Sequence, residues 1–294
     1  MTLSIIAKGA KAPDNAPVFG NLVYTDSLQF ALRATSKQNA FDLSDNEVDF
    51  LVQNGASFNQ NGLSNNSNTG GSVVLDNTCQ FIDMFDYSVQ CVVSGKIKVN
   101  SGISLVADYH NSNGCDTFLG LVRNGATLNF NNFFGAATPA GVGITFSGGA
   151  SSASTVQIPA SHFVINGDNT MTVKPAFIAT SLKVNPSNGN QGSLDIYIKS
   201  QKNEAAYSFQ FALGNPDDFQ FSPAKKRAIF GNTMPNLVHV GGLVDDPWNN
   251  GDSKSIKEIR IDSRHFTADE IEEQYQATKK WLLAEGVLDI SHWR

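Results

Sequence analysis

Short stretches in which apolar and polar residues alternate dominate the chain from about residue 46 onwards. In the segment 194–198, Leu194, Ile196 and Ile198 fall on one face of an extended strand, and Asp195 and Tyr197 fall on the other. Asn-Gly and Gly-Gly pairs separate these stretches, and both residue types tolerate the positive φ angles of tight hairpins. The pattern predicts about eleven strands, at 71–75, 86–93, 102–109, 117–122, 126–130, 143–146, 171–178, 192–198, 207–213, 238–244 and 255–262. Many short strands separated by turns favour a two-sheet β-sandwich over a parallel sheet with crossover helices.

One helix is predicted near the C-terminus, over about 268–285. Thr267 is a good N-cap residue, and Glu270 three residues later completes a capping box. Helical spacing then relates a stripe of side chains at Ile271, Tyr275, Thr278 and Leu282, with Ala277 and Trp281 beside it. Gly286 is the expected C-cap. Because the helix is shorter than three or four heptads, we expect it to pack on the sandwich rather than to form a coiled coil.

The first 45 residues differ from the rest, and we interpret 1–45 as an N-terminal arm or docking segment before a sandwich that covers 46–294. Pro13 and Pro17 each restrict themselves and the preceding residue to extended geometry. The stretch 28–34 fits either a strand or a short helix, because its pattern does not choose between them. Two alternatives follow. The arm docks on another subunit or on a second copy of the chain, or it holds the first edge strand of the sandwich.

Composition predicts an exterior with few charges. Hydrophobic residues make up 41% of the 294 residues, whereas charged residues make up only 16%, against roughly 25% in typical domains. Amide, hydroxyl and glycine positions must therefore supply most of the polar surface. The net charge is −6, and no large cluster of Lys and Arg is present, so nucleic acid is not an expected partner.

The sequence shows no targeting or membrane-spanning segment. No apolar run approaches the roughly 18 residues of a membrane-spanning helix. The first eight residues contain a short apolar run without a preceding basic region, unlike a secretory signal. We therefore expect neither membrane insertion nor export through a signal peptide of its own.

The segment 254–275 carries the most specific motif of the chain. Its characteristic positions are Ile256, Glu258, Ile259, Arg260, Ile261, Arg264, Phe266, Thr267, Glu270 and Ile271. This pattern resembles the last strand and the following helix of laminin-G-like, concanavalin A-like lectin domains, although Asp262 occupies a position where that family usually has an aromatic residue. Weaker likenesses occur at 54–58, 72–75, 85–93 and 238–242. The resemblance implies an all-β, concanavalin-like jelly-roll β-sandwich, in a family whose members bind glycans, bind proteins, serve as spacers or support glycosidase sites.

In overall style the chain also resembles a bacteriophage structural protein, because it is amide-rich and places an arm before a sandwich. That resemblance implies a non-enzymatic virion or tail-associated protein, made in the host cytoplasm and located in the virion. Its expected partners are other virion subunits, or a second copy bound through the arm, and host cell-surface glycan. The alternative is a glycan-active enzyme, a glycosidase, or a bacterial lectin on the same fold.

The loop 245–252 is the candidate binding site. It combines an aromatic side chain with carboxylates and amides, in Asp245, Asp246, Trp248, Asn249, Asn250 and Asp252. An aromatic face packs against the C–H side of a sugar ring, while carboxylates and amides pair with the hydroxyls. The same oxygens suit Ca²⁺, which takes roughly six to eight oxygen ligands. An ordinary turn shaped by Pro247 and Gly251 is the third alternative.

No set of residues indicates catalysis, a metal or a cofactor. A glycosidase needs two carboxylates on one face, and Glu258 and Asp262 share a strand face, but Arg260 between them indicates a surface charge ladder. The five histidines lack metal-ligand spacing. Of the three cysteines, Cys91 is expected to be a small buried hydrophobe on a strand face, not half of a disulfide.

Overall fold

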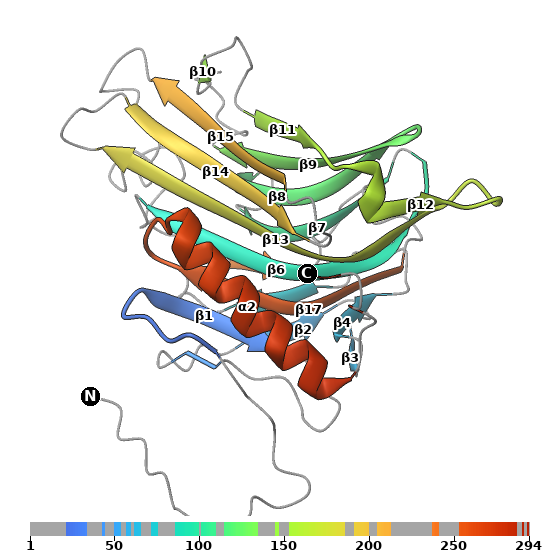
Figure 1. Ribbon diagram of the computed structural model, residues 1–294, viewed down its shortest axis with the longest axis horizontal. Coiled ribbons are helices and arrows are strands. Elements are labelled where there is room, and N and C mark those ends of the chain that lie inside the picture. The colour runs from blue at the N-terminus through green and yellow to red at the C-terminus, as the bar shows by residue number, and fades with distance from the viewer. Residues whose placement is uncertain are drawn as a thin grey trace, which may run out of the picture.

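The computed structural model describes most of the strands and the terminal helix of this chain. The described residues are 22–33, 43–44, 50–53, 57–59, 62–65, 72–75, 86–99, 101–109, 115–134, 145–146, 153–185, 191–199, 205–212, 237–240, 253–286, 290 and 293. Their strands form two antiparallel sheets, and helix α2 (Ala268–Glu285) crosses the outer face of one sheet (Figure 1). The prediction of a mostly β sandwich with a C-terminal helix is confirmed.

Sheet A contains ten of the described strands. Across the sheet the order is β10 (Thr145–Phe146), β15 (Ala205–Ala212), β14 (Gln191–Lys199), β13 (Met171–Asn185), β6 (Tyr87–Ile97), β17 (Ser253–Asp262), β4 (Gly62–Asn65) and β3 (Ser57–Asn59). Two further strands complete it: β1 (Leu28–Arg33) pairs with β17, and β12 (Phe163–Ile165) pairs with β13.

Sheet B contains seven of the described strands. Their order is β11 (Ala153–Gln157), β9 (Thr127–Phe134), β8 (Cys115–Asn124), β7 (Gly102–Tyr109), β16 (Leu237–Val240), β5 (Ser72–Leu75) and β2 (Phe50–Gln53). A short 3-10 turn, η3 (Ala160–His162), precedes β12. Every strand predicted from alternation has a counterpart, 102–109 with the predicted bounds and the others with shifted ends, whereas the short strands β2, β3, β4, β11 and β12 were not predicted.

The main core lies between the two sheets and is built by the predicted alternation. In β14, Leu194, Ile196 and Ile198 are fully buried in this core. In β6, Cys91 is buried on the same inner face as its neighbours at every second position. Burial, and then the charge of nearby Glu258, raise the pKa of the Cys91 thiol. The prediction of a small buried hydrophobe at Cys91 is therefore confirmed.

The N-terminal region contributes a strand to the sandwich. Residues Leu28–Arg33 form β1, which lies antiparallel to β17 with Arg33 opposite Glu258 and Ala31 opposite Arg260. Of the two alternatives for this stretch, the structure shows the internal strand. Residues 1–21, and with them the docking hypothesis for the arm, lie outside the described residues.

Outward-facing residues of sheet A form three rows that cross β14, β13, β6, β17 and β1 in register. The first row is Lys199, Phe177, Val92, Glu258 and Arg33; the second is Tyr197, Ala179, Gln90, Arg260 and Ala31; the third is Asp195, Ser181, Ser88, Asp262 and Leu28. Charged and amide side chains are therefore mixed with apolar ones on the sheet face that α2 covers.

A β-bulge adds one more cation to this face. The pairing of β17 with β6 shifts register between Ile256 and Glu258, which leaves Lys257 as the extra residue. Lys257 is fully buried, and its Nζ lies 5.6 Å from the ring centroid of Trp281 on α2. The guanidinium of Arg33 lies over the same ring, at 4.6 Å.

Helix α2 forms as the capping signals predict. The Thr267 side chain accepts a hydrogen bond from the backbone N–H of Glu270, and the Glu270 carboxylate accepts one from the backbone N–H of Thr267 at 2.8 Å. Gly286 ends the helix in the left-handed conformation, with φ of 63°. Both predicted caps and the predicted bounds are confirmed.

The predicted stripe of α2 packs on sheet A and makes a second core. Ile271, Tyr275, Thr278 and Leu282 are all buried, as is Trp281. The ring of Tyr275 makes an edge contact with Phe177 of β13 and stacks on Trp293, with centroids 5.5 and 5.4 Å apart. The prediction that the helix packs on the sandwich is confirmed.

The prediction of a surface charge ladder at Glu258, Arg260 and Asp262 is wrong, because all three side chains are buried. Arg33 and Glu258 form an ion pair at 3.1 Å whose side chains are only 2% and 1% exposed. Helix α2 and the segment 22–27 cover the ladder: Gln274 accepts a hydrogen bond from Arg260 at 2.9 Å, and Thr25 donates one to Asp262 at 2.6 Å. Burial therefore requires these charges to be paired with one another.

Candidate functional site

The candidate loop 245–252 lies outside the described residues, but both of its anchors are described. Before the loop, Val240 ends β16 and pairs with Val73 of β5 and Val106 of β7, in sheet B. After the loop, Ser253 begins β17 and pairs with Lys96 of β6, in sheet A. The last described residue before the loop therefore lies in sheet B and the first one after it lies in sheet A, with both strand ends directed to the same end of the sandwich.

Three connections between described strands lie at this same end, which we name the hairpin end: 98–101, of which residue 100 is not described, 124–127 and 166–170. The first joins β6 to β7, the second joins β8 to β9, and the third joins β12 to β13. Cross-strand pairs align them, because Ile97 lies opposite Met171 and Gly102 lies opposite Val122. In Figure 1 the hairpin of β12 and β13 reaches beyond the neighbouring strands, at the right of the view.

A single buried guanidinium ties the three turns together. Arg123 donates from Nε to the carbonyl oxygen of Gly125 at 2.8 Å. Its Nη1 donates to the carbonyl oxygens of Ile97 and Asn169, at 3.0 and 2.7 Å. The backbone N–H of Arg123 also donates to the carbonyl oxygen of Ser101 at 2.9 Å. The side chain thus satisfies carbonyl groups in two of the turns and at Ile97, directly before the third, and its backbone N–H bonds the third turn at Ser101, which makes the hairpin end a rigid support.

The tip of the β12–β13 hairpin carries a polar network. The Asp168 carboxylate accepts hydrogen bonds from Lys96 Nζ at 2.7 Å and from the Thr170 hydroxyl at 2.6 Å. These hydrogen bonds, led by the one from Lys96, hold the pKa of Asp168 well below its ordinary value. Asn166 donates from Nδ2 to the Thr170 hydroxyl at 2.9 Å. Since Lys96 lies opposite Ser253, this network adjoins the second anchor of the candidate loop.

The candidate loop contains the one tryptophan of the chain that lies outside the described residues. The chain has three tryptophans, and Trp281 and Trp293 are buried in the core under α2. Trp248 is thus the one tryptophan that the described cores do not account for. Near the hairpin tip, the large exposed side chains are aliphatic, Val164 and Ile165 at 49% and 47% exposure. Among the described residues, the side chains exposed near this tip thus supply no aromatic face for a sugar, and Trp248 is the candidate for that role.

Within the described ranges, no group of three or more His, Cys, Asp or Glu side chains is arranged to hold a metal ion. His265 forms a half-buried pair with Asp195 at 2.9 Å, which attaches the segment before α2 to β14. His162 is fully buried next to β12. No helix in the described part of the chain is both long and apolar enough to span a membrane.

Sequence reasoning missed Arg123, although the chain carries a signal for it. Leu119, Leu121 and Arg123 occupy alternate positions of β8 and all are buried, so Arg123 lies on the core-facing side of its strand. It also directly precedes the Asn124-Gly125 turn, where Gly125 has a φ of 58°. A charged residue in a core-facing position beside a tight turn indicates a side chain that satisfies the turn's carbonyl groups.

Comparisons with known proteins bear on the fold alone. No family model matches the sequence, and no curated protein matches it. Among solved structures, the binding domain of botulinum neurotoxin serotype C1 matches with a TM-score of 0.52 at 11% identity, over 86% of this chain and 52% of that one. The serotype D/C VPI 5993 binding domain matches with a TM-score of 0.52 at 12% identity, again over 86% and 52%.

The serotype D binding domain gives a TM-score of 0.51 at 12% identity, over 85% of this chain and 52% of that chain. This chain therefore spans about half the length of the structures it matches. At such low identity the likeness extends to the arrangement of strands only. The chain is thus similar in fold to the botulinum neurotoxin binding domains, as a two-sheet β-sandwich.

Proposed function

We propose that this chain is a glycan-binding β-sandwich that holds its ligand without cleaving it. The observation that carries the proposal is the position of the two anchors of the Trp248 loop, because β16 ends at Val240 and β17 begins at Ser253 toward the hairpin end that Arg123 holds together. Trp248 supplies a face for a sugar ring, and Asp246 and Asn249 supply partners for hydroxyl groups. The Arg123 network gives such a loop a fixed base, and preorganised sites lose less entropy on binding.

Proteins of similar fold support the class of ligand. The binding domain of botulinum neurotoxin DC has been solved in complex with SialylT, with a TM-score of 0.50 to this chain. Cell entry of botulinum neurotoxin type C is dependent upon interaction with two ganglioside molecules, in a structure with a TM-score of 0.52. Those ligands belong to those proteins. Because proteins of this fold bind such ligands, glycans are the first ligand class to test on this chain.

A glycan array that carries both neutral and sialylated oligosaccharides tests the proposal. We expect binding by the full chain, loss of at least tenfold in affinity for Trp248→Ala, and unchanged affinity for Tyr24→Ala. Tyr24 is a matched control because it is an exposed aromatic residue beside the Asp262 end of β17, opposite to the loop anchor at Ser253. Binding that is equal in both variants, or no binding to any glycan, would contradict the proposal.

Two further measurements distinguish the proposed glycan-binding module from an enzyme and from a Ca²⁺-dependent site. Reducing-sugar release from a bound glycan would identify an enzyme, whereas binding without release supports the module proposed here. Loss of binding in EDTA that Ca²⁺ restores would assign the loop oxygens to a metal. Unchanged binding in EDTA supports direct contact between the loop and the sugar.

We propose a virion or tail of a bacteriophage as the setting of this module. The amide-rich, weakly charged composition supports this narrower assignment. Co-purification of the chain with intact phage particles through a density gradient is the expected result. A chain that remains entirely in the soluble lysate while particles form would contradict the virion assignment and leave the glycan proposal untouched.

A further inference from the structure

Helix α2 has a second stripe of side chains, on the face turned away from sheet A. Asp269, Glu273, Gln276, Lys280 and Leu283 follow one another at spacings of four, three, four and three residues. That spacing keeps them on one helix face, and it is the spacing by which helices pack on each other. Asp269, Glu273 and Lys280 are exposed, and Leu283 is 59% exposed. The inward stripe of the helix is thus packed on sheet A, while this second row of side chains faces away from the sheet.

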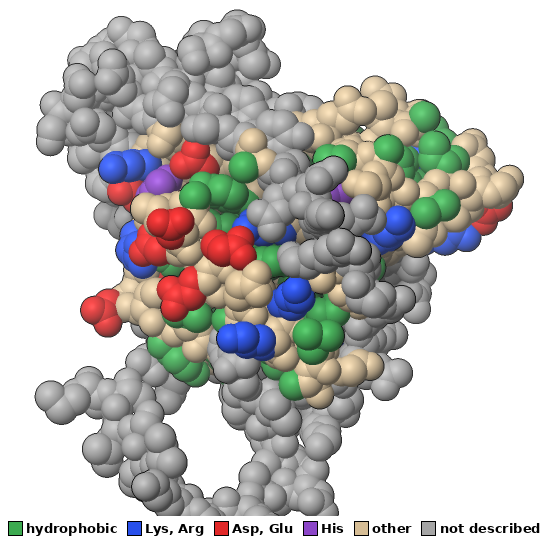
Figure 2. Space-filling view, in the orientation of Figure 1, with side chains coloured by type: hydrophobic (Ala, Val, Ile, Leu, Met, Phe, Trp, Pro, Cys, Tyr) green, Lys and Arg blue, Asp and Glu red, His purple; other side chains and the backbone are tan. Residues whose placement is uncertain are grey.

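This outward row is divided by charge. In the row, Asp269 and Glu273 occupy the first half and Lys280 the second half, and Figure 2 shows red side chains over the start of α2 and blue ones toward its end. Within the described part of the chain, neither Glu273 nor Lys280 forms an ion pair. Two opposite charges seven residues apart, roughly 10 Å along the helix axis, thus face solvent without partners.

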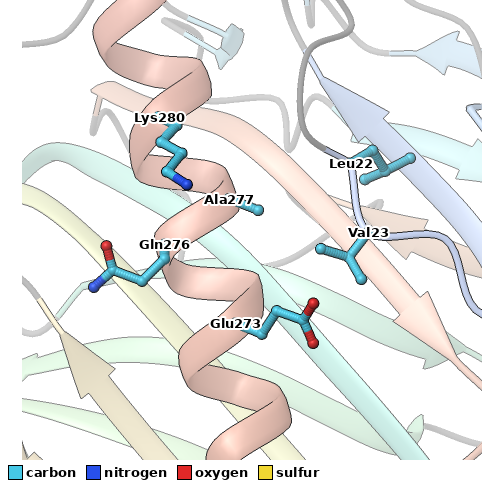
Figure 3. A pocket seen from close by; sticks show the side chains of 6 residues that line it. All are labelled: Leu22, Val23, Glu273, Gln276, Ala277 and Lys280. Atoms are coloured by element: carbon cyan, nitrogen blue, oxygen red, sulfur yellow. The ribbon is translucent and has the colours of Figure 1, made fainter.

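The middle of the row borders a shallow groove of about 270 Å³ between α2 and the segment before β1. Leu22 and Val23 line one side, and Figure 3 shows Ala277 and Glu273 pointing toward them from the helix. Ala277 is the smallest side chain of the groove and is itself buried. A small residue beside the exposed row leaves room for another helix to approach closely.

We propose that a second copy of this chain docks here, with the two α2 helices antiparallel about a twofold axis near Gln276 and Ala277. Glu273 and Lys280 are equally distant from that midpoint. The axis therefore places Glu273 of each copy opposite Lys280 of the other, so that one contact is made twice, as twofold symmetry requires. Parallel helices would instead place like charges together. The complementary charges of Glu273 and Lys280 thus favour a second copy of the chain, bound in the antiparallel orientation.

Charge reversal tests this surface in the full chain. Sedimentation velocity over a concentration series should show a dimer for the unaltered chain. Glu273→Lys alone, and Lys280→Glu alone, should each weaken the dimer roughly tenfold or more, because each places like charges together at both contacts. The doubly exchanged variant E273K/K280E should recover dimerisation. Lys183→Glu, an exposed residue of β13 with the same change of charge, is the matched control and should have no effect.

Mixing the two single variants gives the most specific result. One copy then carries two lysines and the other two glutamates at these positions, so a mixed dimer restores both ion pairs, and we expect it to form more tightly than a dimer of either variant alone. Equal thermal midpoints of the monomers would show that both variants are folded. A chain that stays monomeric at every concentration overturns the proposal. So does a dimer that the reversals leave intact, which would place self-association elsewhere, including residues 1–20.

Discussion

Arg260 and Asp262 form a two-pronged ion pair beneath helix α2, although they are separated by only one residue of β17. Arg260 Nε donates to one carboxylate oxygen of Asp262, and Nη2 donates to the other at 2.9 Å. Neither side chain is more than 1% exposed. Thr25 and Ser27 donate to the same carboxylate, at 2.6 and 3.1 Å, so the pair also holds the segment before β1 against the sheet.

Asp262→Ala is expected to destabilise the protein by about 3–5 kcal/mol, because it leaves the Arg260 guanidinium buried without its counter-charge. Urea denaturation followed by tryptophan fluorescence measures the change. Asp269→Ala, in the exposed first turn of α2, removes the same group and should cost less than about 1 kcal/mol. Equal costs for the two variants would contradict the structural role of the buried pair.

Trp281→Ala is expected to cost about 3–5 kcal/mol, since the side chain is fully buried between α2 and the cations Arg33 and Lys257. Leu283→Ala, two residues further along the helix and 59% exposed, is the control and should change stability by no more than about 0.5 kcal/mol. Both variants should be measured at low protein concentration, so that self-association does not contribute to the free energy of unfolding. A small effect of Trp281→Ala would mean that α2 does not depend on the sheet.

The start of α2 should weaken in acid. An ion pair with Arg264, with further hydrogen bonds from Thr267, lowers the pKa of Glu270 from its ordinary 4.5 to about 2. Because the folded pKa is lower than the unfolded one, Glu270 stabilises the fold fully above about pH 4.5 and loses that contribution as the pH falls toward 2. Glu270→Gln keeps a capping acceptor but has no charge to lose. The stability difference between the two proteins should therefore shrink between pH 5 and pH 2, by denaturation at each pH, and a constant difference would contradict this role.

Arg123→Met should loosen the hairpin end. The variant leaves the carbonyl oxygens of Ile97, Gly125 and Asn169 without their donor, which we expect to cost about 2–4 kcal/mol. Hydrogen exchange should accelerate at Asn169, whose backbone N–H donates to Asn166 at 3.0 Å. Lys98→Met alters an exposed cation in a neighbouring turn and should leave exchange unchanged. Unaltered exchange in Arg123→Met would mean that the turns hold their geometry without the guanidinium.

The candidate site could be predicted only in part. Trp248 and its acidic and amide neighbours are visible in the sequence as a local cluster, because they are adjacent in the chain. The support beneath that cluster is not local. Lys96 and Asp168 are 72 residues apart, and Arg123 and Asn169 are 46 residues apart. Such contacts follow from the pairing of strands, and alternation alone does not specify which strands pair.

The longer strands and the terminal helix were determined by the sequence itself, because alternation, Asn-Gly turns and the Thr267–Glu270 capping box act over a few neighbouring residues. Tertiary structure alone decided the state of Leu28–Arg33, which becomes a strand because the edge of β17 is available to it. It also decided that Glu258, Arg260 and Asp262 are buried. Alternation shows that they share a face, but only the packing of α2 and of residues 22–27 on that face removes it from water.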